Sequence, residues 1–193
     1  MAQSPIVFIT GGVRSGKSTL AEELACLQVK ESGGDLHYIA CGQPSDQEMK
    51  KRIKRHQLER QKHPYAWKVW ECPVQIGMAA CHFKKSDVIV LDCLTTLVNN
   101  ELFYSDQMME ENNWIDNLKD RIINDLEEIR KHCGYLIIVS NEILNEPIKG
   151  NKMVKTYAKI LGELHQSIVV NASHAILVEA GLPMMMKGDC LWK

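Results

Sequence analysis

A glycine-rich segment near the start of the chain has the residue types that bind phosphate. Residues 11–18 read GGVRSGKS and fit the pattern G-x-x-x-x-G-K-[ST] at every fixed position. In such a loop, backbone N–H groups point at phosphate oxygens, and the amino end of the next helix adds a favourable dipole. Lys17 would reach the β- and γ-phosphates, and Ser18 would bind Mg²⁺. We therefore expect a nucleotide-binding loop made of Gly11, Gly12, Val13, Arg14, Ser15, Gly16, Lys17 and Ser18.

An acidic residue at the end of a later apolar run completes the expected metal site. Asp92 directly follows VIVL at residues 88–91. A strand-end carboxylate in this position holds Mg²⁺ in many nucleotide-binding proteins. An aspartate at a strand end also serves as a turn residue or helix cap, and the upstream loop favours the metal role. We predict Mg²⁺ as the cofactor, with Ser18 and Asp92 as its ligands.

A basic helical segment between these two motifs carries a candidate nucleophile. Arg52, His56 and Arg60 are spaced four residues apart, so they share one face of a helix. Two flanking cations would depress the pKa of the histidine and keep its imidazole neutral, which is the nucleophilic form. The same two arginines are placed to hold a triphosphate. A solvated surface histidine is the alternative that this spacing leaves open.

The elements that must position these residues follow from the alternation of apolar and amphipathic segments. We expect strands at residues 5–10, 36–40, 88–91, 136–140 and 175–178, and helices from residue 18, over 45–61, over 112–132 and over 154–170. Strands that alternate with helices indicate βαβ units and a mainly parallel sheet covered on both faces. The prediction is a P-loop NTPase-like α/β fold, formed by residues 1–193 as a single nucleotide-binding transferase domain.

Composition narrows the class of protein further. The chain has 193 residues, 45% of them hydrophobic, and a formal net charge of −1, which argues against a nucleic-acid binder. No apolar run approaches the roughly 20 residues that span a bilayer, and the start does not read as a signal peptide. The cysteine count is seven, with no C-x-x-C pair, so we expect free thiols and a cytoplasmic protein.

These motifs together resemble one enzyme family. Residues 46–49 read DQEM, the spaced Arg52, His56 and Arg60 follow, and residues 91–100 read LDCLTTLVNN. With the glycine-rich loop, their order and spacing are similar to the bifunctional adenosylcobinamide kinase / adenosylcobinamide-phosphate guanylyltransferases of cobalamin biosynthesis. The match runs from about residue 6 to residue 103, with weaker similarity to residue 181. Such enzymes phosphorylate adenosylcobinamide and then transfer GMP from GTP to the product, through a GMP-histidine intermediate.

The resemblance implies the following roles for this chain. His56 would be the nucleophile, and Lys17 and Asp92 would act with it in catalysis. GTP and ATP would be substrates beside the corrinoid, and the chain would form a homo-oligomer, with a trimer as the expected form. It would neither bind nucleic acid nor insert into a membrane. Implied nucleotide contacts beyond the loop are Cys41, Gly42, Gln43, Arg52, Gln57, Leu58, Glu59, Arg60, Glu71 and Asp92.

The chain also departs from the family pattern at two places. Gln61 follows Arg60 where the family has proline, and Trp67 comes a few residues late. Residues 143–146 read ILNE where the family continues V-G, and residues 155–159 read KTYAK in place of R-x-x-R-D. The nucleotide half therefore matches more fully than the corrinoid half. A P-loop kinase of another small alcohol and a non-catalytic nucleotide-binding protein remain as alternatives.

Overall fold

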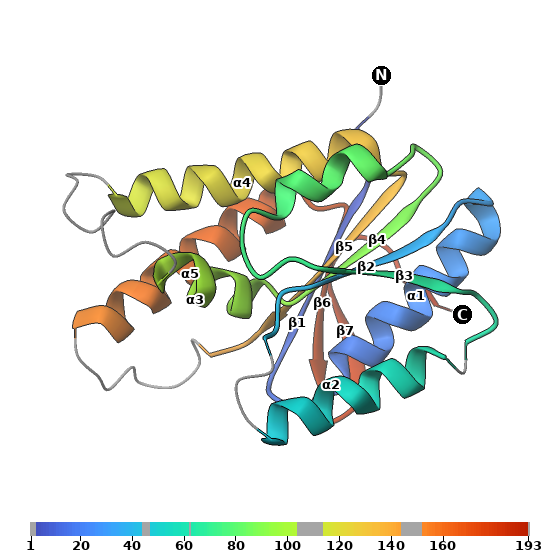
Figure 1. Cartoon of the computed structure of the whole chain (residues 1–193), viewed down its shortest axis with the longest axis horizontal. Coiled ribbons are helices and arrows are strands. Elements are labelled where there is room, and N and C mark those ends of the chain that lie inside the picture. Colours follow the sequence, from blue (N-terminus) through green and yellow to red (C-terminus); the bar gives the residue numbers. More distant parts are fainter. Residues whose placement is uncertain (1–2, 44–46, 62, 104–113, 144–151, 193) are drawn as a thin grey trace.

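One seven-stranded sheet, in the order β3-β2-β4-β5-β1-β6-β7, organises the chain (Figure 1). The computed structural model describes residues 3–43, 47–61, 63–103, 114–143 and 152–192, except for the side chains of residues 48, 49, 52, 53 and 59. The strands are β1 Ile6–Gly11, β2 Leu36–Ala40, β3 Trp67–Glu71, β4 Val88–Asp92, β5 Tyr135–Asn141, β6 His174–Glu179 and β7 Leu182–Lys187. The helices are α1 Lys17–Ser32, α2 Gln47–Arg60, α3 Leu94–Phe103, α4 Trp114–His132 and α5 Lys152–Asn171, with a 3₁₀ helix, η1, at Ile76–His82.

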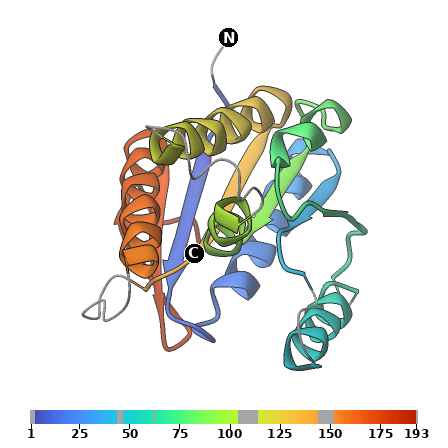
Figure 2. The same cartoon turned by 60° about the vertical axis from the view of Figure 1, so that its left-hand side comes forward.

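Both faces of the inner strands are buried, and successive strand residues point to opposite sides of the sheet. In β1, Val7 and Ile9 pack with apolar residues of α1 on one face. Ile6 and Phe8 pack on the other face with apolar residues of α3, α4 and α5. The two figures show the same arrangement, with α4 and α5 lying across one side of the sheet (Figures 1 and 2). The expected α/β fold is confirmed, since every strand pairing is parallel except that of β6 with β7.

The expected strands and helices all form within a few residues of their predicted ends, but the sequence reading missed four elements. Strand β3 reads WKVWE and β7 reads LPMMMK, and neither is a continuous run of aliphatic residues. Both lie at edges of the sheet, where exposed positions dilute the apolar pattern. Helix α3 begins only two residues after β4 ends, so no loop separates it from the strand in the sequence. The short helix η1 was also missed.

The carboxyl ends of the central strands converge on one edge of the sheet. Gly11 pairs with Asn141 in the β1–β5 register, and Ala40 pairs with Asp92 in the β2–β4 register. Ligands of open α/β sheets bind at this edge. Helix α2 lies beside the same edge and outside the two helical layers, as Figure 2 shows. Of the α2 side chains that the structure describes, only that of Arg60 is buried. None of the described helices is long and apolar enough to cross a membrane.

Candidate active site

The glycine-rich loop joins β1 to α1 and is closed by its own hydrogen bonds. The Ser15 backbone N–H donates to the Gly12 carbonyl at 3.2 Å, and Leu20 N–H donates to the Gly16 carbonyl at 3.0 Å. The Lys17 side chain is only 3% exposed, and its ammonium group donates to the Gly12 carbonyl at 2.9 Å. The lysine thus lies folded across the loop, where a bound phosphate would compete for its protons.

Two glycines of the loop are required for different physical reasons. Gly16 has a φ of 96°, a conformation that favours glycine at the start of α1. A Cβ on Gly11 would lie 2.3 Å from the Val178 carbonyl oxygen, so Gly11 lets β1 approach β6. The turn between β6 and β7 touches the loop as well, because Gly181 N–H donates to the Ser15 carbonyl at 3.0 Å. The turn between β6 and β7 therefore supports the loop.

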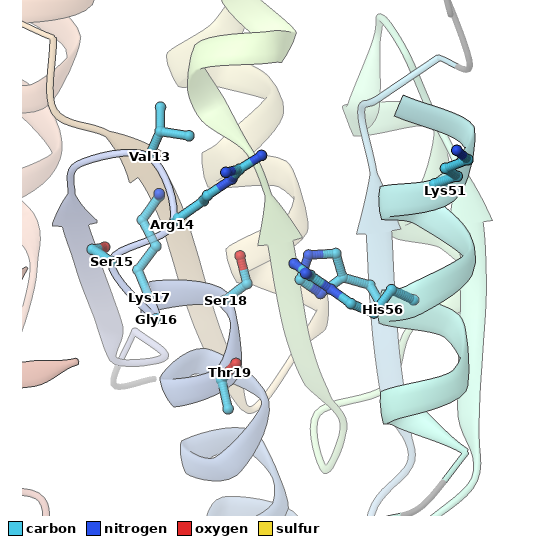
Figure 3. A pocket seen from close by; sticks show the side chains of 10 residues that line it. Val13, Arg14, Ser15, Gly16, Lys17, Ser18, Thr19, Lys51 and His56 are labelled. Atoms are coloured by element: carbon cyan, nitrogen blue, oxygen red, sulfur yellow. The ribbon is translucent and has the colours of Figure 1, made fainter. Parts of the chain in front are cut away.

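A pocket of about 720 Å³, here called the loop pocket, opens between this loop and α2. Figure 3 shows His56 projecting from α2 across the pocket toward Ser18. The cations that line the pocket are Arg14, Lys17, Lys51 and Arg55, and the structure gives it no carboxylate in the described part of its lining. Four positive charges and the loop N–H groups suit the multiple negative charges of a triphosphate or pyrophosphate.

A second pocket of about 390 Å³, here called the strand-end pocket, adjoins the first, and His56 lines both. Its polar lining includes Glu71, Asp92 and Asn141 at the ends of β3, β4 and β5. The Tyr38 hydroxyl donates to Asp92 Oδ2 at 2.7 Å. Burial, together with the Asp92 charge, raises the pKa of Tyr38 well above its ordinary value, so the hydroxyl keeps its proton.

The predicted magnesium ligands provide oxygen donors at this edge. Ser18 lines the loop pocket and Asp92 lines the strand-end pocket, beside the shared His56. A hydroxyl and a carboxylate are ligands that a hard cation such as Mg²⁺ prefers. The Tyr38 hydrogen bond uses one carboxylate oxygen of Asp92 and leaves the other. The donor set therefore fits Mg²⁺, and its binding stays a prediction.

Arg60 is placed differently from a simple surface cation. Its guanidinium forms an ion pair with Glu22 of α1 at 3.1 Å, and its central carbon lies 3.8 Å from the centroid of the Tyr38 ring. The side chain is 6% exposed and that of Glu22 is 2% exposed. Arg60 still lines the strand-end pocket, so a contact with nucleotide stays a prediction beside this structural role.

The remaining predicted nucleotide contacts divide into four groups. Gly42, Gln57 and Glu71 line the strand-end pocket with His56. Cys41 is fully buried. Its backbone N–H donates a hydrogen bond to the Asp92 carbonyl, and its carbonyl accepts one from the Asn100 side chain, so it supports the site through its backbone. Gln43 and Leu58 are exposed, and neither lines these two pockets. The side chains of Arg52 and Glu59 lie outside the described residues, as do residues 144–151 of the departing segment.

Sequence reasoning missed several residues that the fold brings to the site. Lys50 and Lys54 line the strand-end pocket, while Lys51 and Arg55 line the loop pocket. The i, i+4 spacing within each pair was a readable signal, because such residues share one helix face. Glu22 had no such signal, since its partner Arg60 lies on another element.

A separate cluster of Asp35, His37 and Asp87 has the composition of a metal site but is occupied by hydrogen bonds. Trp70 Nε1–H donates to His37 Nδ1 at 2.9 Å, so the other ring nitrogen carries the proton and donates to Asp87 Oδ2 at 3.2 Å. A metal on that nitrogen would move the proton to Nδ1, against the Trp70 N–H. Burial lowers the pKa of His37 and keeps it neutral, as a structural histidine.

The sheet order, the glycine-rich loop and the strand-end carboxylate define a P-loop nucleotide-binding protein. The family model for cobinamide kinase / cobinamide phosphate guanyltransferase matches residues 7–186, and the chain belongs to this family.

Curated relatives and a solved structure resemble the chain along most of its length. The chain is 34% identical to the bifunctional adenosylcobalamin biosynthesis protein CobP of Pseudomonas aeruginosa, covering 95% of this chain and 98% of that protein. It is 29% identical to the bifunctional adenosylcobalamin biosynthesis protein CobU of Salmonella typhimurium, and the match covers 94% of this chain and 99% of that protein. A crystal structure of the flagellar accessory protein FlaH from Methanocaldococcus jannaschii superposes with a TM-score of 0.49 and 16% sequence identity. The superposition covers 99% of this chain and 81% of that one.

Proposed function

We propose that this chain phosphorylates adenosylcobinamide and then transfers GMP from GTP to the resulting phosphate, forming adenosylcobinamide-GDP. Membership of the cobinamide kinase / cobinamide phosphate guanyltransferase family supports the reaction class. The observation that carries the proposal for this chain is that His56 lines both the loop pocket and the strand-end pocket. One imidazole at that junction has access to a nucleotide whose phosphates lie in the loop pocket.

The guanylyl transfer would proceed in two displacements. A ring nitrogen of His56 attacks the α-phosphorus of GTP, and the bond from that phosphorus to the bridging oxygen of pyrophosphate breaks. Pyrophosphate leaves with that electron pair, and Lys17, Lys51 and Arg55 are placed to balance its charge. A phosphate oxygen of adenosylcobinamide phosphate then attacks the same phosphorus, and the imidazole leaves. The covalent route divides a reaction between two large substrates into two simpler steps.

The kinase reaction would use the same loop. The γ-phosphoryl group of ATP or GTP passes to the substrate hydroxyl, and the loop N–H groups with Lys17 hold the β- and γ-phosphates. Mg²⁺, bound by Ser18 and Asp92, would neutralise phosphate charge in both reactions. The loop N–H groups and the cations of α2 would orient the phosphates.

The decisive experiment is incubation of the pure protein with α-labelled GTP and Mg²⁺, read out by intact mass. We expect a mass gain of one GMP, with label that survives base and is lost in acid, as a phosphoramidate requires. His56→Ala should abolish the adduct. His132→Ala is the matched control, because His132 is 43% exposed on α4 and lines neither pocket.

The result also separates the alternatives. Folded protein that binds GTP but forms no adduct would contradict the histidine mechanism. If such a protein still transferred the γ-phosphate to an alcohol, a simple kinase would replace the proposal. Absence of turnover with any corrinoid would leave a nucleotide-binding protein.

Two further properties are proposed from the family resemblance. The chain would work in the cytoplasm, which fits seven cysteines that are all free. It would assemble as a homo-oligomer, with a trimer as the expected form. Light scattering coupled to gel filtration gives the mass directly, and a monomer at micromolar concentration would contradict the second property.

A further inference from the structure

The Asp92 carboxylate is held by a residue of the neighbouring strand. Asp92 pairs with Ala40 in the β2–β4 register, and Tyr38 lies two residues before Ala40, so both side chains emerge on the same face of the sheet. The Tyr38 side chain is buried, and its hydroxyl donates to Asp92 Oδ2 at 2.7 Å. A phenol donates one proton, so this hydrogen bond fixes which carboxylate oxygen is left for another partner.

The ring of Tyr38 is in turn held by Arg60. The Arg60 guanidinium stacks on the ring at 3.8 Å and forms the buried ion pair with Glu22. Glu22 lies one helical turn after Ser18 on α1, and Arg60 is the last residue of α2. A continuous set of contacts therefore joins the helix that begins at the phosphate loop, the end of the helix that carries His56, and the strand-end carboxylate.

We propose that Tyr38 is a positioning residue that orients Asp92 toward Mg²⁺, and that Arg60 and Glu22 make this orientation depend on how α2 is seated. The inference rests on the proposed function, in which Asp92 is a metal ligand. A carboxylate with one oxygen restrained presents the other oxygen in a single direction. Its side chain therefore loses less conformational freedom when it binds the metal ion. Partners that orient a metal ligand in this way commonly change metal affinity about 10- to 100-fold.

The experiment measures metal binding directly, with Mn²⁺ as the probe and electron paramagnetic resonance as the readout, in the presence of GTP. Tyr38→Phe removes the hydroxyl and keeps the ring beneath Arg60. We expect the Mn²⁺ dissociation constant to rise by about 10-fold. Tyr135→Phe is the matched control, because Tyr135 is a partly buried tyrosine at the opposite end of β5. It should leave Mn²⁺ affinity unchanged.

A double-mutant cycle tests the route through α2. Glu22→Gln removes the charge of the ion pair with Arg60 and keeps an amide oxygen as acceptor, so it weakens the hold on Arg60 without replacing Tyr38 or Asp92, and we expect it to weaken Mn²⁺ binding several-fold. If both changes act through the same contact, the Tyr38→Phe/Glu22→Gln double variant should bind Mn²⁺ about as weakly as Tyr38→Phe alone. Fully additive losses would overturn the role of Arg60 and Glu22. Thermal unfolding of each variant verifies that the protein remains folded.

The outcome is separable from that of the proposed function. Equal Mn²⁺ affinity in the wild type and Tyr38→Phe overturns the positioning role, even when the wild type forms the His56 adduct. Equal affinity in the wild type and Asp92→Asn also overturns it, because Asp92 would then not be a ligand. Absence of the adduct in the wild type contradicts the histidine mechanism, while a Tyr38-dependent Mn²⁺ affinity would still support the positioning of Asp92.

Discussion

Gly181 donates its backbone N–H to the Ser15 carbonyl at 3.0 Å, so the turn between the last two strands supports the phosphate loop. Gly181 has a φ of 81°, and Ala180 before it has a φ of 49°. A residue with a Cβ at position 181 would be strained by the positive φ, although nothing lies within 4 Å of the place that the Cβ would occupy. The shape of this turn therefore bears on the geometry of a loop that lies far away in the sequence.

Gly181→Ala should lower stability by about 1 kcal/mol and also weaken nucleotide binding. The matched control is Gly33→Ala, because Gly33 has a φ of 66° and open space around it, at the far end of α1. Both variants should lose similar stability in urea unfolding. Only Gly181→Ala should raise the dissociation constant for GTP in a fluorescence titration. Equal nucleotide affinity in the two variants would show that the turn does not shape the loop.

The first two glycines of the loop should differ sharply in their tolerance of a methyl group. A Cβ on Gly11 would lie 2.3 Å from a backbone oxygen of β6, whereas nothing lies within 4 Å of a Cβ on Gly12. Gly11→Ala should therefore destabilise the protein by about 1–3 kcal/mol, and Gly12→Ala should leave its stability nearly unchanged. Thermal unfolding without ligand compares them. A loss for Gly12→Ala as large as that for Gly11→Ala would be incompatible with this packing.

The buried ion pair between Glu22 and Arg60 should be costly to break from one side. Glu22→Ala leaves a 6% exposed guanidinium without its carboxylate, and we expect a loss of about 3–5 kcal/mol in the free energy of unfolding. Glu128→Ala removes the partner of Lys131 on the surface of α4, where both side chains are well exposed. That control should cost no more than about 1 kcal/mol. Comparable losses in the two variants would contradict the difference in burial.

Stability should fall as the pH drops below about 6.5, the ordinary pKa of a histidine. Burial lowers the pKa of His37 and of His165, so the unfolded chain binds protons that the folded chain refuses. Stability then increases with pH up to the unfolded pKa, is fully present above it, and is lost as the pH falls toward the lower folded value. Urea unfolding at pH 7.5 and 5.5 measures the loss. His37→Gln, which can still donate to Asp87, should reduce the pH dependence of the free energy of unfolding. The same loss between pH 7.5 and 5.5 in the wild type and in His37→Gln would contradict a role of His37 in this dependence.

The motifs that carry chemistry could be predicted from the sequence because each is local. The glycine-rich loop, the helix bearing His56 and the strand-end Asp92 all form as their spacing indicates. The Tyr38–Asp92 hydrogen bond could not be predicted, since it depends on which strands pair and in what register. Helical spacing placed Arg60 on the face of His56, but its guanidinium turns to Glu22 of α1, a preference set by tertiary packing. Edge strand β3 was missed because its polar residues interrupt the apolar pattern.

The position of β1 in the sheet has a consequence for the order of events during biosynthesis. The strand that leads into the phosphate loop is synthesised before both of its neighbours in the sheet, which are β5 and β6 from the later part of this chain. A strand at the centre of a parallel sheet gains its hydrogen bonds only when such distant partners arrive. The nascent chain therefore carries an unpaired, apolar β1 until β5 and β6 have been synthesised, and nucleotide can stabilise the loop only after that point.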